Sequence, residues 1–295
     1  MVDTIRQDRK PTVLVTGAGS GLGFDTALFL AAKGYAVWGS VLNAAEAAVL
    51  AEGAERHQVR VQVLRVDVTQ RREIETAVRA LLEQEGRIDA LVHFAGVTLA
   101  GFFEDLSAEE LRRVYDVNVL GMVSTVQAVL PHMRETGKGR IVIASSIFGR
   151  IGAPGAGAYV ASKFAVEGFA ESLALEVAPF DIFVSLLEPS FIRTPLFGIH
   201  RASAARATDP DGPYYAWFCR NQQFVDSLLR RTSLTASDVA RATYAILSSR
   251  RPRLRYVLGR TAKCLLGLRR HVPGELFERV WFSVNRRRAL RCLAR

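Results

Sequence analysis

A regular alternation of short apolar runs with longer amphipathic stretches constrains this chain more than any other feature. Strands that are apolar at every position are buried on both faces, which is typical of a parallel sheet covered by helices. The pattern therefore predicts one doubly wound α/β domain with a parallel sheet of about seven strands. The expected strands are residues 12–16, 36–40, 59–66, 88–94, 140–144 and 182–187, with 256–258 as an edge strand. The expected helices are residues 21–33, 44–56, 71–85, 108–136, 158–178 and 237–249.

A glycine-rich segment, Thr16–Gly23, lies between the first expected strand and the first expected helix. Glycines permit a tight turn and a close approach to a pyrophosphate, and the helix start supplies free N–H groups and a positive dipole end. This position predicts a nucleotide site in a Rossmann-type domain. A methyltransferase carries a related loop, and a bare strand-to-helix turn needs no ligand, so the loop alone does not decide the chemistry.

Tyr159 and Lys163 lie four residues apart in an expected helix and therefore share one face. A phenol has a pKa of about 10, too high for a base at neutral pH, and a neighbouring ammonium lowers that pKa. We expect Lys163 to tune Tyr159, which would then exchange a proton with a substrate oxygen. Ser146 and its neighbour Ser145 end the preceding strand, and either hydroxyl is a candidate to stabilise charge on that oxygen.

The loop Thr-Gly-xxx-Gly-x-Gly and the pair Tyr-xxx-Lys together resemble the short-chain dehydrogenase/reductase family, in particular its steroid and retinol dehydrogenase-like members. The resemblance covers about Pro11 to Gly259. It implies an enzyme that moves a hydride between NAD or NADP and an alcohol, ketone or aldehyde. An alternative is a cofactor-binding scaffold or sensor with weak turnover, which would act through its C-terminal tail at a membrane surface.

The resemblance assigns four catalytic positions, and this complete set favours the enzyme. The family spacing prefers Ser146 over Ser145, and Lys163 would also hold the nicotinamide ribose. Asn118 matches a helix asparagine that holds a water in a proton relay; the alternative is a polar residue that kinks its helix. The four implied catalytic residues are Asn118, Ser146, Tyr159 and Lys163.

The resemblance also implies a set of cofactor contacts. Asp67-Val68 matches the pair at the adenine ring, and Thr194 matches a threonine that holds the carboxamide, although Ser190 replaces the usual glycine. Ala95-Gly96 ends a motif whose two asparagines are replaced by His93-Phe94, and His93 fits a core histidine better than a catalyst. The expected cofactor contacts are Gly17, Ser20, Gly21, Leu22, Gly23, Val41, Asp67, Val68, Ala95, Gly96, Tyr159, Lys163, Pro189 and Thr194.

The end of the second strand, where the ribose is discriminated, carries neither of the usual signals. An acid that selects NAD would fall near Val41, and an arginine that selects NADP would fall at Ser20 or Leu42. Without the carboxylate a 2′-phosphate is not repelled, and without the arginine it is not held. The sequence therefore leaves both NAD and NADP open.

Residues 191–231 fall outside the regular alternation and are rich in aromatic groups and proline. In the family this region is a lid over the substrate, and its apolar character favours a lipophilic alcohol or ketone such as a steroid, a retinoid or another lipid-like molecule. The alternative is that these aromatic groups only pack the lid onto the body.

The charge of the chain is concentrated at its C-terminal end. Residues 250–295 contain 14 Lys/Arg and 2 Asp/Glu, whereas the net charge of the whole chain is +10. We therefore divide the chain into a domain at 1–259 and a basic helical extension at 260–295. Its interleaved Leu, Phe and Trp fit a helix on an anionic membrane face, or a helix docked on the body with a solvated basic face. No nucleic-acid-reading motif occurs, so we expect no nucleic-acid partner.

Location and assembly are further expectations. The start of the chain lacks an apolar signal segment, and no run of about 18 uncharged apolar residues occurs. The cysteines at 219, 264 and 292 have no metal-ligand spacing, so we expect neither a metal site nor a disulfide framework. We expect a cytoplasmic protein, peripheral on a membrane, and the family implies a homodimer or homotetramer built through residues 108–136 and 158–178.

Overall fold

The computed structural model describes residues 10–198 and 201–293. Residues 1–9, 199–200 and 294–295 lie outside the described part; they belong to the predicted domain at 1–259, to its lid at 191–231 and to the extension at 260–295. Its core is a parallel sheet of seven strands in the order β3-β2-β1-β4-β6-β7-β9, which confirms the predicted doubly wound fold. The strand order reverses between β1 and β4, so the connections that leave these two strands run toward opposite sides of the sheet. The strands are β1 (Thr12–Thr16), β2 (Ala36–Val41), β3 (Val61–Arg65), β4 (Ala90–His93), β6 (Gly139–Ala144), β7 (Ile182–Pro189) and β9 (Arg255–Leu258).

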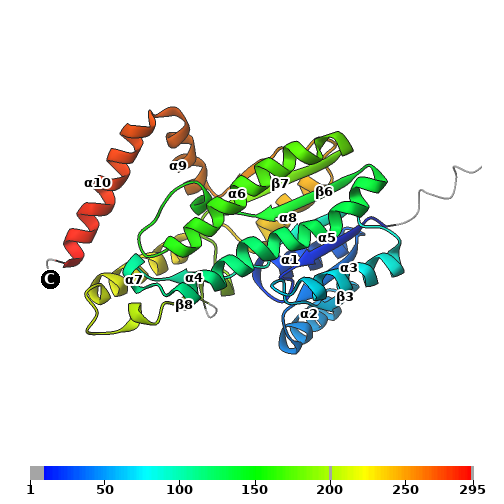
Figure 1. Cartoon of the computed structure of the whole chain (residues 1–295), viewed down its shortest axis with the longest axis horizontal. Coiled ribbons are helices and arrows are strands. Elements are labelled where there is room, and N and C mark those ends of the chain that lie inside the picture. The colour runs from blue at the N-terminus through cyan, green and yellow to red at the C-terminus, as the bar shows by residue number, and fades with distance from the viewer. Residues whose placement is uncertain (1–9, 199–200, 294–295) are drawn as a thin grey trace, which may run out of the picture.

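Helices cover both faces of the sheet (Figure 1). One core contains Leu28 of α1, Leu50 of α2 and Val239 of α8. The opposite core contains residues of α3, α5 and α6, which include Met122 and Val166. The helices are α1 (Gly21–Ala32), α2 (Ala44–Arg56), α3 (Arg71–Glu85), α4 (Ala108–Tyr115), α5 (Gly121–Thr136), α6 (Gly157–Val177), α7 (Tyr215–Arg231), α8 (Ala236–Leu247), α9 (Arg260–His271) and α10 (Gly274–Leu293).

Local sequence signals set several helix ends. The side chain of Thr235 accepts a hydrogen bond from Asp238 N at the start of α8, and the Asp238 carboxylate accepts one from Thr235 N. This reciprocal pair is a capping box, and it satisfies two backbone N–H groups that have no partner within the helix. Helix α3 ends at Gly86, whose φ of 70° is the left-handed conformation that glycine adopts without strain.

The long helix expected over residues 108–136 is interrupted. A single π-helical turn, Asp116–Leu120, separates α4 from α5. Such a turn inserts an extra residue and rotates the side chains that follow, and Asn118 lies within it. The periodicity of the sequence does not reveal this turn, because both flanking segments keep helical spacing.

The segment 191–231 is more regular than expected, because it contains the seventeen-residue helix α7. Phe218, Asn221 and Leu229 are the buried residues of α7. A two-stranded parallel sheet, β5 (Leu99–Ala100) with β8 (Ala202–Ser203), ties this segment to the loop after β4.

The C-terminal tail packs on the body through one edge of α10. Phe277 and Trp281 stack on each other and join a cluster with Ile147 and Ile151, and the Trp281 indole donates to the carbonyl of Gly152 at 3.1 Å. Figure 1 shows α9 and α10 forming an arm at the edge of the molecule. Among the described residues, no helix has the length and apolarity needed to span a bilayer.

Another face of α10 is not covered by the body. Leu276, Val280 and Val284 follow one another at four-residue spacing and are 52%, 54% and 58% exposed. The tail is therefore docked along one edge of α10 and open along the next.

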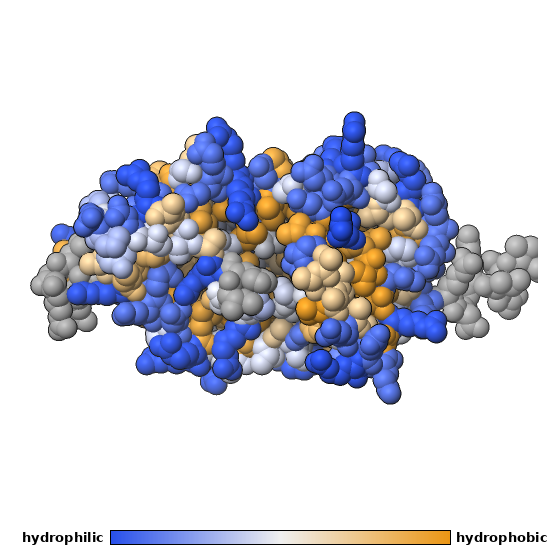
Figure 2. Space-filling view, turned by 90° about the horizontal axis from the view of Figure 1, so that it is seen from below, coloured by the Kyte–Doolittle hydropathy of each residue, from blue (hydrophilic) through white to orange (hydrophobic). Residues whose placement is uncertain are grey.

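Apolar groups also gather near the middle of one face of the molecule, within a hydrophilic border (Figure 2).

The contact of the glycine loop with α1 predicts a strong effect of Gly23→Ala. A Cβ at Gly23 would lie 2.1 Å from the carbonyl oxygen of Gly17, which is backbone and has little room to move. We expect a loss of about 3 kcal/mol in the free energy of unfolding, measured by urea denaturation. The matched control is Gly168→Ala in the middle of α6, where a Cβ meets nothing within 4 Å, and a gain of about 0.5–1 kcal/mol is expected. Equal stability of the two variants would contradict this packing.

Candidate active site

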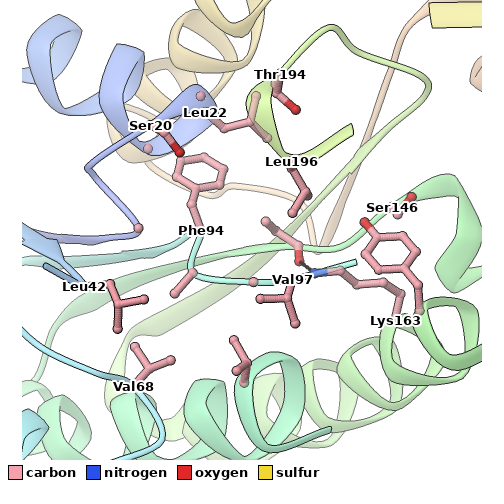
Figure 3. Close-up of a pocket in the computed structure, with 18 of the residues that line it drawn as sticks. Ser20, Leu22, Leu42, Val68, Phe94, Val97, Ser146, Lys163, Thr194 and Leu196 are labelled. Carbon is pink, nitrogen blue, oxygen red and sulfur yellow. Dashed lines mark hydrogen bonds between the residues drawn. The ribbon is translucent and has the colours of Figure 1, made fainter. Parts of the chain in front are cut away.

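A cavity of about 840 Å³ opens at the carboxyl ends of the strands, across the point where the strand order reverses. Ser146 and Lys163 lie at one end, and Leu42 and Val68 lie at the other (Figure 3). Thr194, in the loop that follows β7, lies beside the glycine loop, since a Cβ at Gly21 would lie 3.4 Å from the Cβ of Thr194 (Figure 3). This elongated site between two half-sheets has the shape and position of a dinucleotide site in a doubly wound fold.

Every residue that the sequence predicted to contact the cofactor lines this cavity. Of the four predicted catalytic residues, Ser146, Tyr159 and Lys163 line it as well. Asn118 does not; it is buried behind the cavity wall. The cavity is also lined by residues that no sequence pattern indicated, because their positions depend on the fold: Glu46, Arg112, Arg113 and Val117.

The glycine loop forms a cradle that fits a pyrophosphate. Gly17 and Gly21 have φ of 66° and 53°, a backbone conformation that side chains other than glycine rarely adopt. Ser20 caps α1 without a side-chain hydrogen bond, and the first turn of α1 contains no acidic residue. The N–H groups and the positive dipole end of α1 therefore face the cavity, and no acidic side chain of that turn opposes a bound anion.

Tyr159 and Ser146 meet at the catalytic end. The Tyr159 side chain is 5% exposed, and its ring contacts Phe197 edge to face with a centroid separation of 6.1 Å. Burial raises the pKa of Tyr159 to about 12, and a hydrogen bond with Ser146 opposes that shift. The prediction that the pKa of Tyr159 is lowered is therefore wrong, because burial of the phenol outweighs the other influences on it.

Lys163 lies one helical turn after Tyr159, but its ammonium does not lie on the phenol oxygen. Its Nζ donates to the carbonyl of Ala144 at 2.8 Å and lies 5.6 Å from the centroid of the Tyr159 ring. Burial lowers the pKa of Lys163 to about 8, while the nearby carboxylate of Glu167 raises it. A buried lysine with this pKa exchanges protons near neutral pH.

Two buried carboxylates support this end of the cavity from behind. Glu167 bonds Arg255 at 2.9 Å, and Glu188, which has no exposed surface, bonds Arg150 at 3.2 Å and lies 3.4 Å from Arg255. Burial, then the neighbouring Glu167, raises the pKa of Glu188. Glu167 lies one helical turn after Lys163, so the lysine lies next to one of these two buried carboxylates, whose arginine partners are 40% and 27% exposed.

Asn118 joins the wall of the cavity to α6. Its Oδ1 accepts from Val97 N at 2.7 Å, and its Nδ2 donates to the carbonyl of Val97 at 2.9 Å and to the Ser162 hydroxyl at 3.0 Å. The π-helical turn presents the amide to the loop after β4, where it bonds both backbone groups of one residue. Such a pair of bonds fixes the position of that loop.

His93 is a buried core residue beside the site. Its Nδ1 lies 3.0 Å from the Thr16 hydroxyl, which accepts from Phe94 N and Ala95 N. Among the described residues its Nε2 has no hydrogen-bond partner. Burial, and then the charge of Lys163, lowers the pKa of His93 to about 3, so the ring is neutral at physiological pH.

The apolar and aromatic side chains of residues 191–231 lie in two different places. Ile192, Leu196 and Phe197 line the cavity next to Tyr159. Tyr214 and Trp217 instead pack on Phe102, with ring centroids 5.3 and 4.2 Å away. Part of the segment is therefore open to the cavity, and part of it packs onto the body.

Comparisons with known proteins agree with this geometry. Residues 11–204 match the model of the short chain dehydrogenase family. A 3-ketodihydrosphingosine reductase from Bacteroides thetaiotaomicron is 34% identical over 226 residues, 77% of this chain and 76% of the relative. Retinol dehydrogenase 8 from Bos taurus is 35% identical over 258 residues, 84% of this chain and 81% of the relative.

Solved structures give the same result. A short-chain dehydrogenase from Streptomyces avermitilis has a TM-score of 0.79 and 34% identity, with 94% of this chain and 98% of that chain covered. A short-chain dehydrogenase/reductase from Burkholderia phymatum in complex with NAD has a TM-score of 0.76 and 26% identity, with 88% and 92% covered.

The lowered pKa of His93 predicts a specific dependence of stability on pH. The unfolded chain takes up a proton at this ring below about pH 6.5, whereas the folded chain does not until about pH 3, so stability is lost as the pH falls. His93→Asn should remove about 2 kcal/mol of the loss in unfolding free energy between pH 7 and pH 5. The control is His57→Asn at an exposed position. An unchanged slope in His93→Asn would show that His93 titrates in the folded protein.

Proposed function

Since the chain belongs to the short-chain dehydrogenase/reductase family and is an NAD(P)-dependent oxidoreductase of alcohols and ketones, we propose that it interconverts a lipophilic alcohol and its ketone or aldehyde. One observation carries the proposal. Ser146, Tyr159 and Lys163 converge at one end of a cavity whose other parts fit a dinucleotide.

In this proposal Tyr159 is the acid/base. Its raised pKa keeps the phenol protonated at neutral pH, so in the reductive direction its hydroxyl donates a proton to the carbonyl oxygen of the substrate. Ser146, hydrogen-bonded to Tyr159, donates to the same oxygen and stabilises its developing charge. The bound nicotinamide supplies or accepts the hydride.

Lys163 and Asn118 have supporting roles in the proposal. Lys163 returns a proton toward Tyr159, because its pKa of about 8 lets it hold or release a proton near neutral pH, and it bonds the nicotinamide ribose. Asn118 holds the loop at Val97 against α6 and thereby orders the wall beside Lys163. We propose Asn118 as part of the proton relay, because its amide donates to the hydroxyl of Ser162, the residue that precedes Lys163 in α6.

The walls of the catalytic end support a lipophilic substrate. Ile192, Leu196 and Phe197 present apolar surface to the space next to Tyr159. Two relatives carry the names of a retinol dehydrogenase and a 3-ketodihydrosphingosine reductase, both of which denote lipid-like substrates. We propose a ketone or alcohol on a long or polycyclic apolar body.

We also propose a peripheral membrane contact through the tail, residues 260–295, as an extension of a catalytic domain at 1–259 with its lid at 191–231. The open face of α10, formed by Leu276, Val280 and Val284, lies on the same helix as several arginines. Apolar groups that enter the interface next to basic groups are the pattern of a helix that lies on an anionic bilayer.

A second copy of the chain is the other proposed partner. Exposed apolar side chains, among them Leu120, Phe164 and Phe169, occur on the π-helical turn and on α6, which lie against each other. These are the helices through which we propose a homodimer or homotetramer.

The acid/base proposal is tested by Tyr159→Phe, which removes the transferable proton and little else. We expect kcat to fall by about 10²- to 10⁴-fold while cofactor affinity stays within about twofold. The measurements are nicotinamide absorbance with a panel of lipophilic alcohols and ketones, and titration calorimetry of the cofactor. Tyr115→Phe, at an exposed position of α4, is the control and should keep full activity. Near-normal turnover by Tyr159→Phe would refute the assignment.

The membrane proposal is tested with the full chain by cosedimentation with vesicles. We expect binding to phosphatidylserine vesicles that weakens as salt rises, and little binding to phosphatidylcholine vesicles. Replacing Leu276, Val280 and Val284 by Ser should reduce the partition coefficient at least about tenfold. The control replaces Val49 and Val63, which are exposed apolar residues away from the tail, by Ser. Equal binding of both variants, or indifference to lipid charge, would refute the contact.

A further inference from the structure

The end of the cavity opposite Tyr159 contains a carboxylate that the sequence pattern did not place there. Glu46, in the first turn of α2, lines the cavity together with Val41 and Leu42. Its Oε2 accepts a hydrogen bond from Leu42 N at 2.8 Å, while Asn43 Oδ1 accepts from Glu46 N at 2.9 Å. These two bonds fold the side chain back over the carboxyl end of β2, where Figure 3 shows Leu42.

The same carboxylate lies directly on the glycine loop. A Cβ at Gly19 would lie 2.5 Å from the Cβ of Glu46 and 2.6 Å from its Oε2. The loop is itself tied to β2, because Ala18 N donates to the carbonyl of Ser40 at 2.8 Å. Glycine at position 19 therefore makes room for the carboxylate of Glu46 between the glycine loop and the end of β2.

This is the place at which doubly wound domains bind the ribose of the adenosine half, where an acid accepts hydrogen bonds from the ribose hydroxyls. We propose that Glu46 takes that role and selects NAD over NADP. The inference rests on the proposed function, since it concerns the same cofactor site. A carboxylate that accepts one hydrogen bond keeps acceptor sites for the 2′-hydroxyl, whereas a 2′-phosphate would bring about two negative charges against it.

The cavity also contains groups that could favour the opposite choice. Arg112 and Arg113 of α4 line it, and Arg112 forms an ion pair with Glu109 at 3.4 Å. Neither arginine is near the end of β2 in sequence, and Leu42 stands where the family places an arginine for the phosphate. A measured preference for NADP would assign the phosphate to these arginines and overturn the role of Glu46.

Titration calorimetry of the full-length chain with NAD⁺ and NADP⁺ tests the proposal independently of any substrate. We expect the unmodified chain to bind NAD⁺ at least about 100-fold more tightly than NADP⁺. Glu46→Gln keeps the size of the side chain and its acceptor for Leu42 N, but removes the charge; it should shrink this ratio by about tenfold or more. The control is Glu52→Gln, at an exposed position of the same helix, which should leave the ratio unchanged.

A second variant, Leu42→Arg combined with Glu46→Gln, should bind NADP⁺ more tightly than NAD⁺. Thermal unfolding of each variant checks that the start of α2 is intact. Equal binding of both nucleotides by the unmodified chain, or an unchanged ratio in Glu46→Gln, would overturn the inference and leave the dehydrogenase function in place. Failure to bind either nucleotide would instead overturn the proposed function, and the inference with it.

Discussion

The hydroxyl of Thr16 holds the arrangement on which the site depends. Thr16 ends β1, and its Oγ1 accepts from the backbone N–H groups of Phe94 and Ala95, just beyond the end of β4. These two strands are neighbours in the sheet, yet the chain leaves them toward opposite sides. Because one hydroxyl fixes the two departing loops to each other, the glycine loop and the loop at Gly96 keep a constant separation. The cavity exists because these loops diverge from a fixed point.

Burial decides the chemistry of the groups around that cavity. Desolvation raises the pKa of Tyr159, lowers the pKa of Lys163 and lowers the pKa of His93, in each case because the charged form loses water. Tyr159 and Lys163 come from α6, whereas His93 ends β4. The site therefore combines a protonated phenol, a lysine that titrates near neutral pH and a neutral histidine, and only the packed protein produces this combination.

The C-terminal helix α10 links two elements near the site at the surface of the molecule. Phe277 and Trp281 of α10 pack on the loop that follows Ser146, and Arg288 of α10 donates to Asn221 of α7. Helix α10 therefore bridges that loop and α7. A helix that contacts both elements restrains them together. Its uncovered apolar face lies beside this contact.

The sequence by itself determined the parallel sheet, the glycine loop and the common helix face of Tyr159 and Lys163, because strand and helix periodicities and short-range spacings are local properties of the chain. The choice of Ser146 came from the resemblance to the family. The tertiary structure alone decided what depends on contacts between distant elements. The π-helical turn at Asn118 left no distinct periodicity, because the helical segments on both sides of it keep their spacing. The pKa values followed from burial, which no spacing reports. Glu46 lies only four residues after Leu42 and bonds its N–H locally, but its place against Gly19 of the glycine loop, at the edge of the cavity, depends on the packing of α2 on that loop.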